Sequence, residues 1–165
     1  MDRVIVWHRW SPTAEPSREA VSLGAHWRAA ARDRFHQVQA TVLSELGGSA
    51  VFALETSQLL RAVELCLTAV REAEREDSGA GGLSCGIAVG SVERERSEGE
   101  PAGAFYGDVI DRAQALAHAA GTHDIVLDAA AQAAASATFL FAREVATSAG
   151  LGGAVLDRAF ARRSD

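Results

Sequence analysis

The stretches Cys-Gly-Ile-Ala-Val-Gly at 85–90 and Gly-Asp-Val-Ile-Asp-Arg-Ala-Gln-Ala-Leu at 107–116 decide the fold that the sequence predicts. The first is a short apolar run of the kind found in buried strands. The second begins with a glycine and then repeats apolar residues every three or four positions, which predicts a helix over 108–120. Gly121 ends that helix, and residues 125–127 predict the next strand. A strand, a polar loop, a helix and a strand therefore organise the rest of the chain.

Four further elements are predicted before this unit. The apolar residues between Ala31 and Leu46 recur at the spacing of one helix face, and Gly47-Gly48 accepts the left-handed conformation of a helix end. One helix is therefore predicted from about residue 25 to residue 46. A run of β-branched and aromatic residues predicts a strand at 3–10, and a short apolar run predicts another at 50–53. A wide apolar stripe predicts a helix at 56–70. Residues 11–22 predict a polar loop or a short helical turn.

The chain after 127 predicts a short alanine-rich helix capped by Asp128, then strands at 138–144 and 154–160. Residues 92–103 have almost nothing apolar to bury and predict an exposed hairpin tip or a disordered, flexible loop. The expected order is β-α-β-α-β, loop, α-β-α-β-β, within one domain over 1–165. Strands interleaved with amphipathic helices favour an α+β sheet with helices packed mainly on one face.

The composition excludes several classes of function. The formal net charge is −6 and the arginines are dispersed, which argues against nucleic acid as a partner. No window approaches the length of a membrane span and no signal peptide is visible, so a cytoplasmic protein is predicted. All 16 basic residues are arginine, which indicates a high-GC, bacterial type of genome and excludes chemistry that needs lysine.

No metal site and no cofactor are predicted. Cys66 and Cys85 lie on apolar faces without metal-ligand spacing, so buried thiols are expected. His118 and His123 flank a turn beside Asp124, and surface histidines are favoured there over a proton relay. Asp108 and Asp111 lie on one helix face, where an N-cap with a first-turn acid is favoured over a functional carboxylate pair.

The order of these segments resembles the catalytic domain of class III adenylyl/guanylyl cyclases. The first half of such a domain is similar to 36–70, and the second half is similar to 85–90, 107–116 and 121–127. Leu151-Gly-Gly-Ala-Val-Leu resembles its closing strand. The resemblance implies a ferredoxin-like α+β nucleotidyl cyclase fold, a mostly antiparallel sheet, and a tendency to pair head to tail.

The resemblance also implies positions for two metal-binding aspartates, and neither is an aspartate here. The first falls on His8, an imidazole where magnesium would prefer a carboxylate. The second belongs to a hairpin between the double glycine and the strand at 50–53. Gly48 runs into that strand almost at once, so the hairpin is predicted to be deleted together with the base-reading lysine before it.

The family's transition-state asparagine and arginine fall on Asp111 and Ala115. Alanine removes the positive charge that would stabilise the transferred phosphate, and a carboxylate would repel the nucleotide. The second base-reading position falls near Ala104, which has no polar side chain. Arg112 lies next to the matched asparagine and is expected to face elsewhere.

The leading hypothesis is a catalytically inactive cyclase-like domain that acts as an interaction or regulatory module in signalling. It would pair with itself or with another signalling protein. Possible interface or cleft residues are Trp7, Trp10, Phe105 and Tyr106, with Trp7 and Trp10 on opposite faces of their strand. The alternative is a nucleotide or small-metabolite sensor that uses the residual cleft, although a bound nucleotide is not expected. An active cyclase is the third hypothesis.

Overall fold

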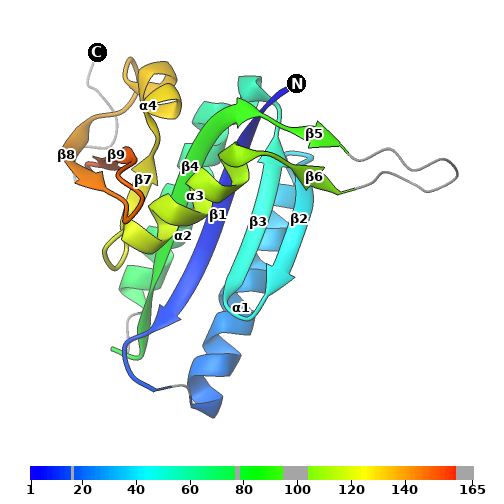
Figure 1. Ribbon diagram of the computed structural model, residues 1–165. Coiled ribbons are helices and arrows are strands. Elements are labelled where there is room, and N and C mark those ends of the chain that lie inside the picture. The colour runs from blue at the N-terminus through cyan, green and yellow to red at the C-terminus, as the bar shows by residue number, and fades with distance from the viewer. Residues whose placement is uncertain (16, 77–78, 95–103, 159–165) are drawn as a thin grey trace, which may run out of the picture.

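The computed structural model describes residues 1–15, 17–76, 79–94 and 104–158, and these form the α+β fold that the sequence predicts. A seven-stranded sheet has the order β2-β3-β1-β4-β7-β9-β8 (Figure 1). Only β4 and β7 pair in parallel, and the other pairs in this sheet are antiparallel. The main strands are β1 (Asp2–Pro12), β2 (Thr41–Leu46), β3 (Ser49–Leu54), β4 (Gly81–Ser91), β7 (Ile125–Leu127), β8 (Phe141–Ala146) and β9 (Gly152–Leu156).

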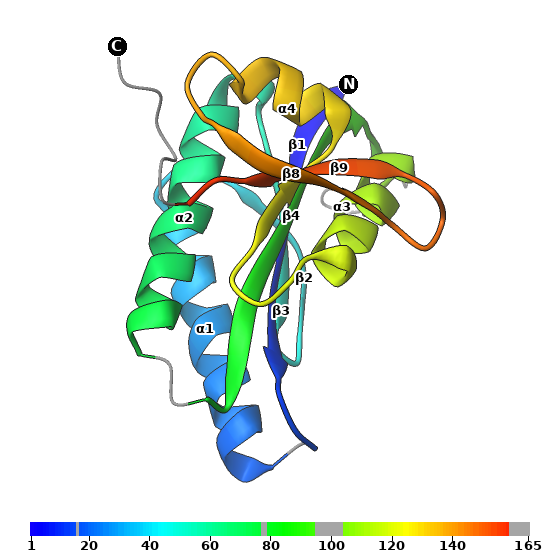
Figure 2. The same ribbon diagram turned by 90° about the vertical axis from the view of Figure 1, so that its left-hand side faces the viewer.

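The helices cover both faces of the sheet, unequally. Figure 2 shows the sheet between α1 and α2 on one side and α3 on the other. The residues of α4 belong to the same hydrophobic cluster as those of α1 and α2, so three helices share one face. The prediction that the helices pack mainly on one face is therefore confirmed. The bounds are α1 (Arg18–His36), η1 (Thr56–Gln58), α2 (Leu59–Arg75), α3 (Asp108–Ala119) and α4 (Ala129–Ala135).

The first six main elements form a ferredoxin-like unit. Their order along the chain is β1-α1-β2-β3-α2-β4, and their order in the sheet is β4-β1-β3-β2. Strand β1 lies between β3 and β4, and the helices on either side of the sheet cover both of its side-chain faces. Val4, Val6 and Trp10 face the α1–α2 core, whereas Ile5 and Trp7 face the smaller core beneath α3.

The helix predicted from about 25 to 46 is wrong at both ends. It starts at Arg18, because the hydroxyl of Ser17 accepts a hydrogen bond from the Ala20 amide at 3.1 Å and caps the helix. It ends at His36, and Gln39 follows in the left-handed region with φ 59. Residues 41–46 then form β2, where Val42 and Leu46 repeat by coincidence at helical spacing.

Smaller corrections concern the last strands, whereas the hairpin alternative predicted for 92–103 agrees with the pairing of the strands at its two ends. The predicted strands at 138–144 and 154–160 are observed as β8 and β9, shifted by a few residues, and Phe160 lies outside the described residues. In the loop predicted at 92–103, β5 (Glu93–Arg94) pairs with β6 (Phe105–Tyr106) in a small second sheet. Residues 95–103 lie outside the described part of the chain. Among the described helices, none is long and apolar enough to cross a bilayer.

Candidate functional site

Helix α3 places the residues that carry the resemblance beside a cleft. It follows Gly107, whose φ of 154 favours glycine and whose missing Cβ would lie 2.7 Å from the Ser91 carbonyl oxygen. The buried face of α3 packs against β4 and consists of Val109, Ala113, Leu116 and Ala117. Ile110 is half-buried and packs against the edge of the same core.

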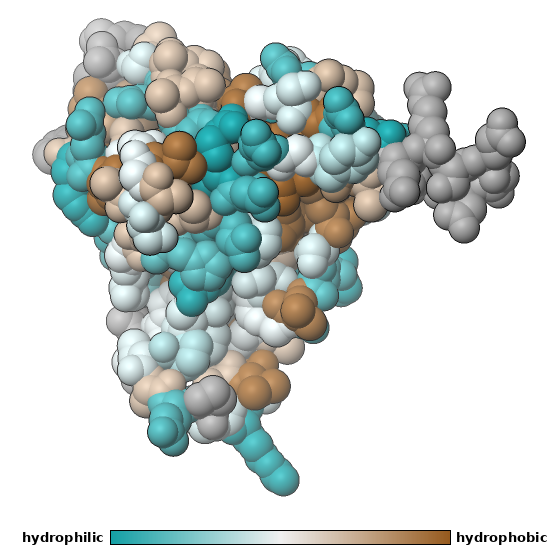
Figure 3. Space-filling view, in the orientation of Figure 1, coloured by the Kyte–Doolittle hydropathy of each residue, from teal (hydrophilic) through white to brown (hydrophobic). Residues whose placement is uncertain are grey.

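Two adjoining hollows lie between α3 and the turn that joins β8 to β9. Each has a volume of about 410 Å³, and both are lined by Asp111 and Ala115. Gln114, His118 and Ser148 add polar groups to the first hollow, and Asp108 and Arg112 add charge to the second. Figure 3 shows hydrophilic residues over the middle of this face, where α3 crosses the sheet. We call the two hollows together the α3 cleft.

The chemistry of the α3 cleft is acidic where the resemblance calls for a cation. Asp111 is exposed and Ala115 is half-buried, so one presents a carboxylate to the cleft and the other a methyl group. A phosphate in this position would meet the carboxylates of Asp108 and Asp111, and the guanidinium of Arg112 in the same hollow is already paired with Asp128. The cleft therefore suits a neutral or cationic ligand better than a triphosphate.

Arg112 lines the second hollow of the cleft, although the sequence predicts that it faces elsewhere, and its guanidinium is held by partners outside the cleft. Its Nε lies 3.4 Å from Asp128 Oδ2, and its guanidinium donates to the Val89 carbonyl oxygen at 3.1 Å. Asp128 is buried and also accepts from the Ala131 amide at 2.9 Å, so it caps α4 as predicted. This carboxylate therefore joins α3, β4 and α4.

We expect Asp128→Ala to lower the free energy of unfolding by about 2 to 3 kcal/mol, since it removes a cap and a partly buried ion pair. Asp124→Ala is the matched control, because its partner Arg143 is 51% exposed and the pair should contribute less than about 1 kcal/mol. Urea denaturation of both variants measures the difference. Equal losses would contradict the role of Asp128 in joining three elements.

His8 is not near the α3 cleft. It is fully buried on the α1–α2 face of β1, opposite Cys85 on β4, and neither ring nitrogen has a partner among the described residues. Burial, reinforced by the positive charge of Arg34, lowers the pKa of His8 from 6.5 to about 3. The side chain is therefore neutral, and it does not come together with Asp111 or Ala115.

The predicted deletion of the hairpin is wrong. Residues 41–54 form the β2–β3 hairpin, and its turn is Gly47-Gly48 itself. The resemblance implies that the second metal-binding aspartate follows a glycine of this hairpin. The residue that follows Gly47 is Gly48, and a Cβ there would lie 2.5 Å from the Trp10 carbonyl oxygen. A carboxylate side chain has no room at this turn without a shift of the backbone. The sequence hid the hairpin because β2 looks like the end of a helix.

The four aromatic residues proposed for an interface or cleft are dispersed. Trp10 is buried in the α1–α2 core, and Trp7 is half-buried on the opposite face, as alternation along a strand predicts. Phe105 is half-buried with the Arg94 guanidinium 5.2 Å from its ring centroid, and Tyr106 is 51% exposed. None of the four lines the α3 cleft, and Ala104 is exposed just before β6.

The remaining polar candidates have local partners. His118 contacts the Gln114 carbonyl oxygen at 2.8 Å, and His123 accepts a hydrogen bond from the Leu83 amide at 3.4 Å. His123 is buried, contrary to the surface position predicted for it. Hydrogen bonding to Cys66 and burial raise the pKa of the Cys85 thiol well above its usual value, so Cys85 remains a thiol, and both cysteines are buried and form no disulfide. Within the described ranges, no group of three or more His, Cys, Asp or Glu side chains could hold a metal.

Comparison with solved structures finds nucleotidyl cyclases. The guanylate cyclase domain of RhGC from Catenaria anguillulae, in complex with GTP, has a TM-score of 0.76 at 10% identity over 98% of this chain and 97% of that chain. The dimeric guanylyl cyclase domain of RhoGC from Blastocladiella emersonii has a TM-score of 0.76 at 8% identity, with coverages of 98% and 97%. The adenylyl cyclase CyaB from P. aeruginosa has a TM-score of 0.73 at 11% identity, with coverages of 95% and 95%.

Comparison of sequences finds no protein-family model and no curated protein that matches the chain. The structural likeness nevertheless extends over nearly the whole chain. The chain therefore has the fold of class III adenylyl/guanylyl cyclase catalytic domains.

Proposed function

We propose that this protein is a catalytically inactive domain of the nucleotidyl cyclase fold that acts as an interaction or regulatory module in signalling. The observation that carries the proposal is Gly48, where a Cβ would lie 2.5 Å from the Trp10 carbonyl oxygen. A metal-binding carboxylate cannot enter this turn, and two-metal catalysis would lose one of its ligands. Ala115 and Asp111 support the proposal, because they leave a transferred phosphate without a positive charge.

The structural neighbours argue in the opposite direction, because they are named as cyclases. The test is therefore direct. Purified protein is incubated with ATP or GTP and Mn²⁺, and cyclic nucleotide is measured against a blank without protein and against an Asp108→Ala/Asp111→Ala variant. We expect no product above the blank. Product that forms with the wild type and decreases in the variant would show an active cyclase and overturn the proposal.

The interaction surface that we propose is the outer edge of β2. This strand ends the sheet, so its outer backbone groups have no neighbouring strand among the described residues, and Val42 and Leu46 are 43% and 78% exposed. Exposed apolar residues on an unpaired edge favour association with another chain. Self-association is the simplest form, and a different signalling protein is the alternative partner.

Leu46→Glu should weaken self-association at least tenfold, because it places a charge on the proposed contact. Leu60→Glu is the control, because Leu60 is also an exposed apolar residue, 39% exposed, on α2. Sedimentation velocity over a concentration series measures both. A wild-type protein that remains monomeric at every concentration would refute the homodimer and leave a heterologous partner to be identified by pull-down with the two variants.

A small-molecule sensor is the second candidate function, and the volume of the α3 cleft favours it. A ligand at about a hundred times its Kd would stabilise the fold by about 2.7 kcal/mol. Thermal-shift measurements with nucleotides and with small amines test this candidate. The carboxylate of Asp111 leads us to expect no shift with nucleotides.

A further inference from the structure

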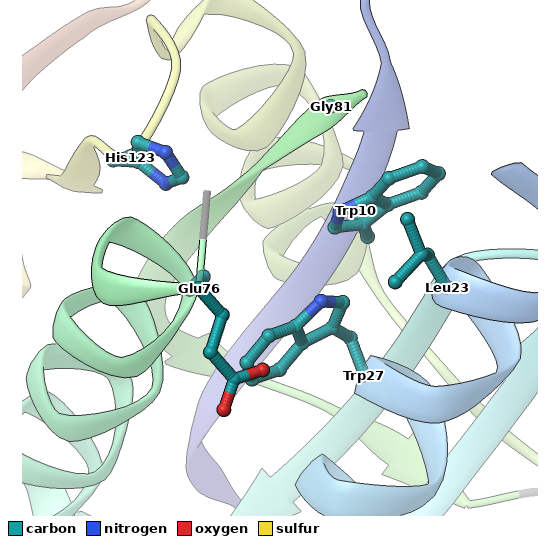
Figure 4. Close-up of a pocket in the computed structure, with 7 residues that line it drawn as sticks. Trp10, Leu23, Trp27, Glu76, Gly81 and His123 are labelled. Atoms are coloured by element: carbon teal, nitrogen blue, oxygen red, sulfur yellow. The ribbon is translucent and has the colours of Figure 1, made fainter. Parts of the chain in front are cut away.

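The indole of Trp10, at the end of β1, separates two hollows. The inner one has a volume of about 30 Å³ and is lined by Trp27, Glu76 and His123 (Figure 4). This volume accommodates about two water molecules, which the unpartnered Nε2 of His123 could bind. The outer one is a groove of about 300 Å³ between α1 and the β2–β3 turn. Only the outer groove has the size of a small-molecule site.

The groove forms where the backbone of α1 and the backbone of the β2–β3 turn approach each other closely. Both contribute a glycine at this point, Gly24 and Gly48, so no side chain lies between them. A Cβ on Gly24 of α1 would lie 3.3 Å from the Gly48 Cα and 3.5 Å from the Trp10 Cε3. The two glycines and the indole therefore form an apolar floor. Val21 lines the same groove and is 67% exposed, an unusual exposure for a large aliphatic side chain.

Arg28 supplies the polar group of the groove. Its Nη1 donates to the Gly47 carbonyl oxygen at 2.8 Å, which holds the guanidinium against the turn. No carboxylate lies within ion-pair distance of it among the described residues, and the Glu45 carboxylate is 3.6 Å from Arg32 instead. The groove thus combines an apolar floor with a positioned cation that lacks a counter-charge.

We propose that this groove binds a small amphipathic monocarboxylate, a free medium-chain or aromatic acid. Its apolar part would lie on Trp10 and against Val21, where it removes apolar surface from water. Its carboxylate would accept charge-assisted hydrogen bonds from the free nitrogens of Arg28. This site is separate from the α3 cleft, but it shares Gly48 with the turn on which the proposed function rests, and octanoate binding and cyclase activity are measured independently of each other.

The test compares octanoate, octanol and octylamine by isothermal titration calorimetry, because the three differ only in the head group. We expect octanoate to bind most tightly. Arg28→Gln should weaken octanoate binding about tenfold or more and leave octanol binding unchanged. Arg28→Lys keeps the charge and should retain octanoate binding within a few-fold.

Two further variants test the location. Val21→Asp should weaken the binding of octanoate and octanol, and Leu60→Asp should weaken neither, because Leu60 lies on α2 outside the groove. Octanol binding to Arg28→Gln also reports that the groove is intact in this variant. The proposal is overturned if octanoate does not bind, if octylamine binds equally well, or if Val21→Asp leaves octanoate binding unchanged.

Discussion

Replacing Gly86 with alanine should lower the free energy of unfolding by about 3 kcal/mol or more. The added Cβ would collide with the Ala113 carbonyl oxygen and lie 2.6 Å from the Ala117 nitrogen. Both are backbone atoms of α3, so no side-chain rotation relieves the contact. The helix would have to move away from β4, and the buried contacts of Val109 and Leu116 would loosen.

Gly152→Ala is the matched control for this prediction. Gly152 is also a strand residue, and a Cβ there meets nothing within 4 Å, so the change should stay within about 0.5 kcal/mol. Urea denaturation followed by circular dichroism measures both variants. A Gly86→Ala protein as stable as the control would contradict the close approach of α3 to the sheet.

The second large effect is a loss of stability in acid that depends on His8. The pKa of His8 is about 3 in the folded protein and about 6.5 when unfolded, so between these values the unfolded chain binds the extra proton. The stability that His8 contributes is therefore fully present above about pH 6.5 and is lost as the pH falls toward 3. A two-unit fall from pH 6.5 to 4.5 should cost about 2 kcal/mol at this group, since each unit corresponds to at most 1.36 kcal/mol and the unfolded imidazole is already half protonated at pH 6.5.

His8→Leu should remove this part of the acid sensitivity. The measurement is the free energy of unfolding from urea titrations between pH 7.5 and 4.5, compared with the wild type, so that contributions from carboxylates cancel. The variant should also be at least as stable at pH 7.5, because it no longer buries two unpartnered ring nitrogens. His36→Leu changes an exposed histidine and should keep the wild-type pH dependence. Equal slopes for the wild type and His8→Leu would contradict a buried, neutral His8.

Much of the fold could be predicted because its central elements have unambiguous local patterns. The apolar stripe of α2 and the β-branched run of β1 correspond to deeply buried faces. Edge strand β2 could not be predicted in the same way. Nearly all its residues are exposed, so burial imposes no alternation on them, and the spacing of Val42 and Leu46 imitates a helix. Pairing with β3, a contact between separate segments, determines that these residues form a strand.

In the candidate site, too, the sequence predicted the placement of some residues and not of others. Asp111 and Ala115 are four positions apart on a predicted helix, and the structure indeed places both in the α3 cleft. His8 is matched to the first metal-binding aspartate by its position along β1. Alternation places it on the opposite face of β1, because the register with β3 and β4 orients the whole strand.

The sequence by itself determined the order of most elements, the cyclase-like arrangement and the absence of lysine chemistry, since these depend on composition and local periodicity. Only the tertiary structure decided which face each residue of β1 occupies, that the double glycine is the turn of a hairpin, and that Gly24 and Gly48 leave a groove beside Arg28. These features depend on strand register and on backbone approach between distant segments, and no local pattern specifies either.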